Sequence, residues 1–253
     1  MTVGAYPRTV SELFDRRARK KAQTREQIRG IAHRLFDERG FDAVTIADVA
    51  RAADVAVQTV FNHFATKEEL FFDGRVSWVD GPAASVTSRR PAEPPLSALR
   101  GYLVTLTGSL VSSLGTEERR RYLATIEASP TLLAHEREHV FEAERRLAAA
   151  LLEAWTDPAT PRPVPANATS AAELTAAIWL SAMRALVVGQ RPHVAAGACP
   201  RELGAGVERL AAALLGRLEA MGDLSEGSAS GQPTTEADGS SDTGWPQAGQ
   251  RAG

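Results

Sequence analysis

The chain has 253 residues, of which 43% are hydrophobic and 24% are charged, a balance typical of a globular protein with one large or two small domains. The sequence contains no apolar run that we expect to span a membrane and no signal-peptide pattern, and the single Cys199 excludes an internal disulfide. We therefore expect a cytoplasmic protein that does not associate with membranes.

The net charge of −2 by itself argues against a nucleic-acid partner. The charges are unevenly distributed, however, because residues 1–34 contain nine basic and three acidic residues, whereas residues 222–253 contain one basic and five acidic residues. Electrostatic attraction is local, so the basic N-terminal region remains a candidate for contacting phosphates.

Residues 1–23 are interpreted as a basic arm that is flexible or partly helical. Three capping boxes then predict where helices begin, each with a threonine at the cap and a polar partner three residues later. These pairs are Thr24 with Gln27, Thr45 with Asp48, and Thr66 with Glu69. Between the last two, a turn at Asp54 precedes a short helix from about Val57 to Phe64. Residues 24–72 are therefore predicted to form a small helical domain.

The rest of the chain also shows only helical periodicity. Residues 80–95 and 156–169 are predicted to be proline-rich loops, and a capping box of Ser170 with Glu173 is predicted to begin a helix that ends near 189. A leucine stripe predicts a final helix over about 201–221, with Leu203, Val207, Leu210, Leu214 and Leu218 facing inward. Residues 222–253 are predicted to be a disordered tail. The predicted fold is all-α, with about nine helices and a second helical domain over 73–221.

The short helix after Asp54 has two different faces. Val57, Val60, Phe61 and Phe64 follow one another at helical spacing and are predicted to form its packed side. The other side carries amide, hydroxyl and imidazole groups from Gln58, Thr59, Asn62 and His63. Two helices joined by a tight turn, the second with such a polar face, are typical of a helix-turn-helix that enters the DNA major groove.

This region resembles the TetR family of bacterial transcription regulators. The resemblance rests on the stretch FDAVTIADVARAADVAVQTVFNHFATKEELF, which follows the family pattern from the threonine that opens the first helix to the Lys-Glu pair of the last. Two positions depart from the pattern: Asp54 replaces the usual turn glycine, and Ala56 replaces the usual serine or threonine cap. The resemblance implies a helix-turn-helix regulator, most often a repressor, that has no enzymatic activity and needs no cofactor.

The resemblance also implies roles for individual residues in binding double-stranded DNA. Three are expected to contact phosphates: Thr45, His63 and Lys67. Three are expected to read base edges: Gln58, Thr59 and Asn62. Phe61 is expected to lie against a sugar or a thymine methyl group, and Arg25 with the cluster Arg16, Arg17, Arg19, Lys20 and Lys21 is expected to follow the backbone or enter the minor groove.

The second domain is predicted to bind a small-molecule effector and to form a homodimer. Broad apolar stripes could enclose a cavity, and the candidate lining residues are Tyr102, Leu103, Leu106, Leu110, Tyr122, Ile126, Phe141 and Trp179. The helices at about 170–189 and 201–221 could pair with those of a second chain in a four-helix bundle. The effector domain resembles that of family members which bind acyl-CoA-like ligands, and a hydrophobic or acyl-CoA-like effector is therefore expected.

One motif supports a different function. His135, Glu136 and His139 lie in a HEREH sequence that matches the H-E-x-x-H signature of zinc metalloproteases. The longer zinc motif does not continue, because Glu142 and Arg145 occupy the positions of its glycine and third histidine. A zinc-dependent hydrolase is therefore the alternative to a DNA-binding regulator, and we expect no metal site in the favoured interpretation.

Overall fold

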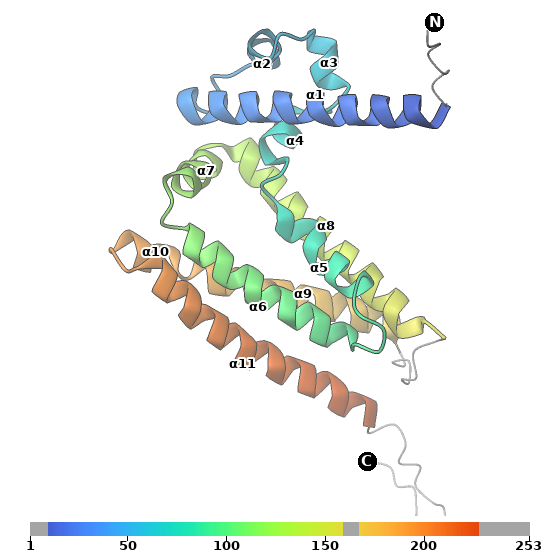
Figure 1. Ribbon diagram of the computed structural model, residues 1–253. Coiled ribbons are helices and arrows are strands. Elements are labelled where there is room, and N and C mark those ends of the chain that lie inside the picture. The colour runs from blue at the N-terminus through green and yellow to red at the C-terminus, as the bar shows by residue number, and fades with distance from the viewer. Residues whose placement is uncertain (1–9, 159–166, 228–253) are drawn as a thin grey trace, which may run out of the picture.

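The computed structural model describes residues 10–158 and 167–227, and within these ranges it contains eleven α-helices and no strand (Figure 1). The prediction of an all-α fold is therefore confirmed. The two helices beyond the predicted nine are α5, Ser77–Thr87, and α10, Arg191–Ala195. The predicted loop at 156–169 and tail at 222–253 lie mostly outside the described residues, although α11 continues to Gly227.

The N-terminal domain consists of four helices. They are α1, Val10–Arg39; α2, Ile46–Ala52; α3, Val57–Phe61; and α4, Lys67–Phe72. In Figure 1, α2 and α3 lie on the side of α1 that faces away from the rest of the molecule, and α4 leads down into the second domain. The helix-turn-helix is therefore the outermost part of the protein at this end.

The prediction that a helix begins at Thr24 is wrong, because Thr24 lies in the middle of α1. Its hydroxyl donates a hydrogen bond to the Lys20 carbonyl one turn earlier, at 3.0 Å. Gln27, the expected capping partner, instead donates from its side chain to the Ala53 carbonyl at 3.1 Å. A polar residue within a helix can thus be satisfied without marking its start, and here Gln27 joins α1 to the end of α2.

The other two capping predictions locate the starts of α2 and α4. Thr45 and Asp48 form a complete capping box. At α4, the Thr66 hydroxyl accepts a hydrogen bond from the Glu69 amide at 3.0 Å, while the Glu69 carboxylate accepts one from the Ala65 amide at 2.7 Å. Together, these contacts occupy amide groups that the first turn of a helix leaves free.

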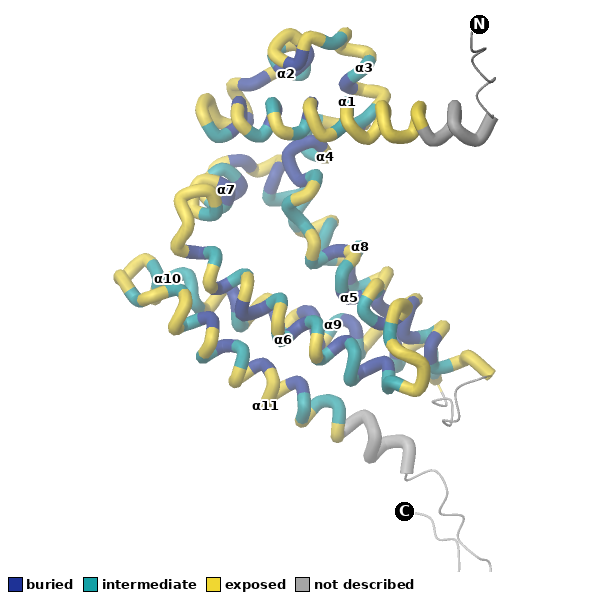
Figure 2. The backbone as a smooth tube through the Cα atoms, viewed as in Figure 1, coloured by how far each residue is buried: buried dark blue, intermediate teal, exposed yellow. Residues whose placement is uncertain are grey.

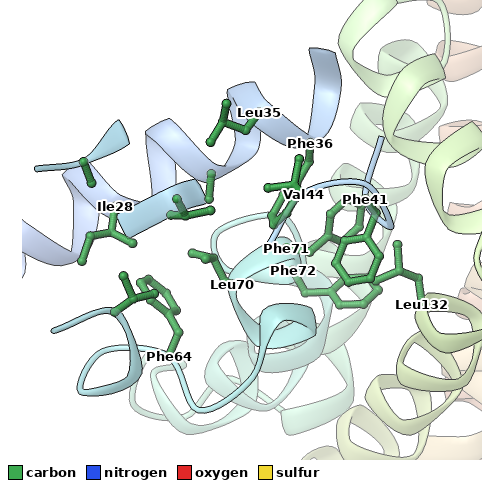
Figure 3. Close-up of a cluster of buried hydrophobic side chains, with 14 of the residues drawn as sticks. Ile28, Leu35, Phe36, Phe41, Val44, Phe64, Leu70, Phe71, Phe72 and Leu132 are labelled. Atoms are coloured by element: carbon green, nitrogen blue, oxygen red, sulfur yellow. The ribbon is translucent and has the colours of Figure 1, made fainter. Parts of the chain in front are cut away.

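The core of the N-terminal domain continues into the second domain. Phe36, Phe41, Phe71 and Phe72 are at most 4% exposed and lie together around the start of α4 (Figure 3). The same cluster of buried residues includes Tyr122, Ile126 and Leu132 from α7, Glu117–Ala128, and α8, Pro130–Thr156. The Phe71 and Tyr122 rings stack with centroids 5.4 Å apart and planes 5° apart. We name this contact, with Phe72, the aromatic joint.

The second domain also contains α6, Pro95–Ser113, and α9, Ala168–Val188, besides α11, Pro200–Gly227. The predicted loop at 80–95 is partly wrong, because α5 extends through Gly81 and Pro82 to Thr87. A Cβ atom at Gly81 would lie 1.6 Å from the Tyr102 hydroxyl, so the glycine makes room for α6 rather than ending a helix. The predicted cap at Ser170 is also wrong, since α9 begins earlier, after Asn167.

Two glycines let α6 and α11 approach closely. A Cβ atom at Gly204 would lie 2.9 Å from the Gly108 carbonyl oxygen and 2.2 Å from the Ser112 hydroxyl. Gly108 in turn leaves room for the Glu208 side chain. We name this contact the glycine crossing.

The expected inward face of α11 is partly wrong. Val207, Ala211 and Leu215 are buried, whereas Leu210 and Leu214 are 47% and 38% exposed. The stretch Ala168–Ala195 has a mean hydropathy of 1.5 and is long and apolar enough to cross a membrane by length and composition. No such stretch was expected from the sequence. A third of its most apolar window is buried within the protein. Its α9 part is apolar on two sides, one of which packs Ala176, Trp179 and Met183 into the domain.

His33 on α1 is expected to make the stability of the protein depend on pH. Its Nε2 lies 3.1 Å from the Leu70 carbonyl, and burial, followed by the Arg75 charge, lowers the pKa of His33 to about 4. In the unfolded chain, His33 has a pKa near 6.5 and therefore binds a proton at pH values where the folded protein does not. The free energy of unfolding thus falls as the pH drops from about 6.5 to 4. Allowing for partial exposure, we expect a loss of about 2 kcal/mol.

Thermal unfolding of the wild type and His33→Gln between pH 7 and pH 4.5 checks this prediction. The glutamine retains a donor for Leu70 but cannot be protonated, so its melting temperature is expected to fall less over this range. Parallel curves for the two proteins would contradict the role of His33.

Candidate nucleic-acid interface

Helix α3, which has no charged residue, lies exposed to solvent at the outer end of the molecule (Figure 2). The turn before it is formed by Asp54, whose φ of 54° is left-handed, and no side chain caps the helix at Ala56. Val60 and Phe64 are buried, at 0% and 1% exposure. The expected four-residue packed stripe is thus half wrong, because Val57 and Phe61 are 41% and 46% exposed.

The exposed face consists of Val57, Gln58, Phe61 and Asn62. Within it, the Gln58 amide donates to the Asn62 side-chain oxygen at 3.2 Å, which holds the two amides together. Thr59 is half-buried at the edge of this face. An exposed aromatic ring beside two amides offers apolar contact for thymine methyl groups and hydrogen bonding for adenine. The prediction that Val57 packs in the core is wrong, because helical spacing alone does not distinguish Val57 from the buried Val60.

His63 and Lys67 lie at the inner edge of this surface. Burial, reinforced by the nearby Lys21 and Arg25 charges, lowers the pKa of His63, which favours a neutral imidazole. The Lys67 ammonium lies 4.1 Å from the centroid of the Phe41 ring, and burial lowers the pKa of Lys67. Both side chains are half-buried, so each can offer a donor at the rim of the surface.

Thr45 lies at the exposed start of α2, where a phosphate contact was expected. Its hydroxyl accepts from the Asp48 amide at 3.1 Å and donates to the Asp48 carboxylate at 2.6 Å. The hydroxyl donor, together with the Thr45 amide that donates to the same carboxylate at 3.0 Å, lowers the pKa of Asp48, which keeps a negative charge at this helix end. Thr45 can therefore meet a phosphate only beside a carboxylate, which weakens that contact.

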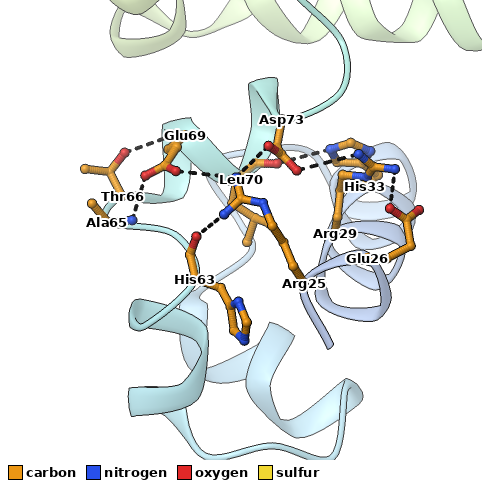
Figure 4. Close-up of polar contacts among 10 residues, drawn as sticks. All are labelled: Arg25, Glu26, Arg29, His33, His63, Ala65, Thr66, Glu69, Leu70 and Asp73. Carbon is orange, nitrogen blue, oxygen red and sulfur yellow. Dashed lines mark hydrogen bonds and ion pairs between the residues drawn. The ribbon is translucent and has the colours of Figure 1, made fainter. Parts of the chain in front are cut away.

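Arg25, expected to contact DNA, is instead held within the domain (Figure 4). Its guanidinium donates to the His63 carbonyl and, at 2.6 Å, to the Asp73 carboxylate, and it lies 4.1 Å from the Phe64 ring centroid. A second ion pair, with Glu69, spans 3.6 Å. Arg25 thus joins α1 to the end of α3 and to α4, and both of its terminal guanidinium nitrogens are engaged in these contacts.

The basic cluster lies on the exposed outer turns of α1. Its members are Arg16, Arg17, Arg19, Lys20 and Lys21, and all five are exposed. No ion pair neutralises any of them among the described residues. Of the five, Lys21 is near enough to His63, just after α3, to contribute to the lowered pKa of that histidine. Helix α3 itself has no charged residue between Val57 and Phe61.

The zinc motif does not form a metal site. His135 Nδ1 lies 3.3 Å from its neighbour Glu138, whereas the His139 ring contacts Phe72 edge-on, with centroids 4.8 Å apart. Among the described residues, no three His, Cys, Asp or Glu side chains are arranged to hold a metal ion. Burial lowers the pKa of His139. Its Nε2 is buried without a hydrogen-bond partner in the described part of the chain, so this histidine belongs to the aromatic joint.

A cavity of about 190 Å³ lies between α8 and α9, close to the aromatic joint. Of the eight predicted pocket residues, only Leu110 lines it. Leu103, Tyr122, Ile126 and Trp179 are buried in the packed clusters, and Tyr102 and Leu106 pack against one of them. Phe141 is 68% exposed and borders a more open surface hollow between α8 and α9. Helical periodicity predicts which residues are apolar and face inward, but it does not distinguish residues that line a cavity from residues that pack in the core.

Comparison with known proteins agrees with this geometry. The family model described as bacterial regulatory proteins, tetR family, matches residues 28–73. The transcriptional regulator TcmR of Streptomyces glaucescens is 31% identical over 137 residues, which cover 52% of this chain and 60% of TcmR. The regulator AcrR of Shigella flexneri is 33% identical over 115 residues, covering 44% of this chain and 51% of AcrR. The chain thus spans little more than half the length of these relatives.

Among solved structures, NalD of Pseudomonas aeruginosa, the secondary repressor of the MexAB-OprM multidrug efflux pump, has a TM-score of 0.46 and 20% identity over 76% of this chain and 95% of its own. The chain thus contains a region, residues 28–73, that matches the TetR family model, and it is similar to the transcriptional regulators TcmR and AcrR.

Proposed function

We propose that the protein is a cytoplasmic homodimeric repressor that binds a pseudo-palindromic DNA operator and leaves it when a small molecule occupies the cavity. The observation that carries the proposal is the exposed face of α3, on which Gln58, Phe61 and Asn62 lie free of the core at the outer end of the domain. A zinc-dependent hydrolase has no comparable support, because His139 is engaged with Phe72.

Two parts of the surface contribute differently to DNA binding: α3 to base contacts and the basic cluster on α1 to phosphate contacts. The uncharged face of α3 suits base edges, which carry sequence information but contribute little electrostatic attraction. The basic cluster on α1 suits phosphates, whose contacts fix position and supply affinity that depends on salt. This division explains how a chain with a net charge of −2 binds a polyanion.

The exposed apolar residues of α9 and α11 support dimerisation. On α9, Leu174, Ile178 and Val188 are 62%, 50% and 43% exposed. Positions 174, 178, 181, 185 and 188 follow helical spacing and form one exposed stripe. On α11, Leu210 and Leu214 are 47% and 38% exposed and supply further apolar area. Two such helices per chain fit a four-helix bundle about a two-fold axis, which would place two copies of α3 about 34 Å apart in successive major grooves.

The aromatic joint supports a response to ligand. Trp78 and Arg119 line the cavity, and both also contact residues of the joint. The Arg119 guanidinium lies 4.8 Å from the Tyr122 ring centroid, and the Trp78 ring lies 6.5 Å from His139. A ligand that repositions either side chain therefore acts on the contacts that hold α4. It can shift the DNA equilibrium by no more than its difference in affinity for the two states.

Replacing Gln58 or Thr59 by alanine is expected to weaken operator binding while leaving the dimer intact. Each removes hydrogen bonding to a base edge, for which we expect roughly a 5- to 100-fold loss. Fluorescence anisotropy with a duplex selected by the wild type from a randomised library measures the loss. Thr125→Ala, on α7, is the matched control and should bind normally. Wild-type affinity in both recognition-helix variants would contradict the assignment of α3.

A further inference from the structure

We propose that the cavity between α8 and α9 binds an amphipathic organic anion, with Arg119 as the main residue that holds its acid group. The inference rests on the proposed function in one respect, because it takes this cavity to be the effector site. It goes further by naming the chemical class of the effector from the residues that surround the cavity.

The size and walls of the cavity define the body of the ligand. A volume of about 190 Å³ corresponds to on the order of 15 positions for water-sized atoms. The walls are mostly apolar, with Trp78 from α5, Leu110 from α6, and Leu180, Met183 and Val187 from α9. The site therefore suits a small aromatic or medium-chain aliphatic body.

The charges around the cavity define the polar end of the ligand. Four arginines line it, at 119, 137, 184 and 191, against a single carboxylate from Glu136. Arg191 pairs with Glu127, outside the cavity, at 3.2 Å. In the described part of the chain, no ion pair involves Arg119, Arg137 or Arg184. A cavity with such a cationic excess favours an anion over a neutral or cationic ligand.

Arg119 and Arg191 each have a buried Nε without a hydrogen-bond partner among the described residues, but only Arg191 also forms an ion pair there. Burial, together with the Arg191 and Arg75 charges, lowers the pKa of Arg119 in spite of Glu136. A partly buried guanidinium with an unsatisfied buried donor gains charge-assisted hydrogen bonds when a carboxylate approaches.

The position of Arg119 also explains how the anion could be sensed. The guanidinium lies over Tyr122, whose ring stacks on Phe71 of α4. An acid group that draws Arg119 toward the cavity changes a contact of the aromatic joint. A neutral ligand of the same shape would fill the apolar part of the cavity without this effect.

Isothermal titration of the full chain with matched probes tests the proposal. The probes are octanoate and 2-naphthoate, their neutral amides octanamide and 2-naphthamide, and the cation octylamine. At least one acid is expected to bind about 10- to 100-fold more tightly than its amide, since one charge-assisted contact is lost. Equal or tighter binding of the amides or the amine would overturn the assignment, and so would the absence of binding by every probe.

Variants identify the residue that holds the acid. Arg119→Gln is expected to remove the preference for acid over amide, whereas Arg119→Lys should retain part of it. Arg121→Gln, two residues along α7 and outside the cavity lining, is the control that should behave as wild type. Arg184→Gln, on an exposed position of α9, gives a second test if Arg119→Gln does not fold. An unchanged preference in the folded Arg119 and Arg184 variants would overturn the role of the arginines.

A separate measurement distinguishes this inference from the proposed function. Anisotropy with the selected duplex, with and without the acid, reports release of DNA. Binding of the acid without release would leave the ligand class standing and contradict the effector response. A protein that binds DNA as a dimer but binds none of the acids would leave the proposed regulator standing and contradict the ligand class.

Discussion

Ile178→Glu combined with Leu214→Glu is expected to produce a folded monomer that has lost its operator. Both side chains are large, apolar and partly exposed, Ile178 on α9 and Leu214 on α11, so a carboxylate at either position costs little in the monomer. In a dimer, the same carboxylates would be buried opposite their own copies without partners, which opposes association. A single recognition helix then binds alone, and affinity for the full operator is expected to fall roughly 10²- to 10⁴-fold.

Sedimentation and DNA titration of the same sample check both halves of this expectation. Ala124→Glu, which adds the same charge at an exposed position of α7, is the control and should remain a dimer with wild-type affinity. A double variant that sediments as a dimer would contradict the assigned interface. A monomer that binds the full operator as tightly as the wild type would contradict the need for two copies.

Phe71→Ala is expected to give the largest loss of stability. The side chain is fully buried and contacts Phe36, Phe41, Phe72 and Tyr122 with ring centroids 5.1–5.8 Å apart. Removing a buried phenylalanine typically costs about 3–5 kcal/mol, because the cavity left behind does not fully collapse. For a chain of this size, the melting temperature should fall by roughly 6–20 °C.

The effect of Phe71→Ala is expected to reach both domains. Tyr122 belongs to the second domain, and burial raises its pKa to about 12, as expected for a ring enclosed in the shared core. We therefore expect one common unfolding transition by circular dichroism and by tyrosine and tryptophan absorbance. Phe141→Ala, at a position that is 68% exposed, is the matched control and should change stability little. Two separate transitions in the wild type would contradict a shared core.

Local signals located the helix-turn-helix well. The Thr45 and Thr66 caps, the left-handed Asp54 and the buried Val60 and Phe64 all follow from residue chemistry within one or two turns. The same reasoning was wrong at Thr24, where the flanking turns are polar and give no apolar stripe. There the Thr24 hydroxyl bonds the Lys20 carbonyl within α1, and Gln27 bonds Ala53, 26 residues away, so neither side chain caps a helix start.

Residues whose role depends on distant partners could not be assigned from sequence. Gly81 resembles a helix breaker until Tyr102 is seen to occupy the space beside it. Arg25 resembles a phosphate contact until Asp73 and Phe64 are seen around its guanidinium. Arg119 gave no signal, since one more arginine in a charged helix is ordinary, and its importance comes from the cavity and Tyr122.

The glycine crossing limits which amino-acid substitutions this protein can accept during evolution. Most surface positions of a helix accept many residues, but any side chain at Gly204 would meet the Gly108 carbonyl and Ser112. Separating α6 from α11 to accommodate it would also move the surface on which Leu210 and Leu214 lie. Substitutions that reshape the cavity between α8 and α9, which Leu110 of α6 lines, are therefore confined to side chains that leave the backbones of α6 and α11 in place.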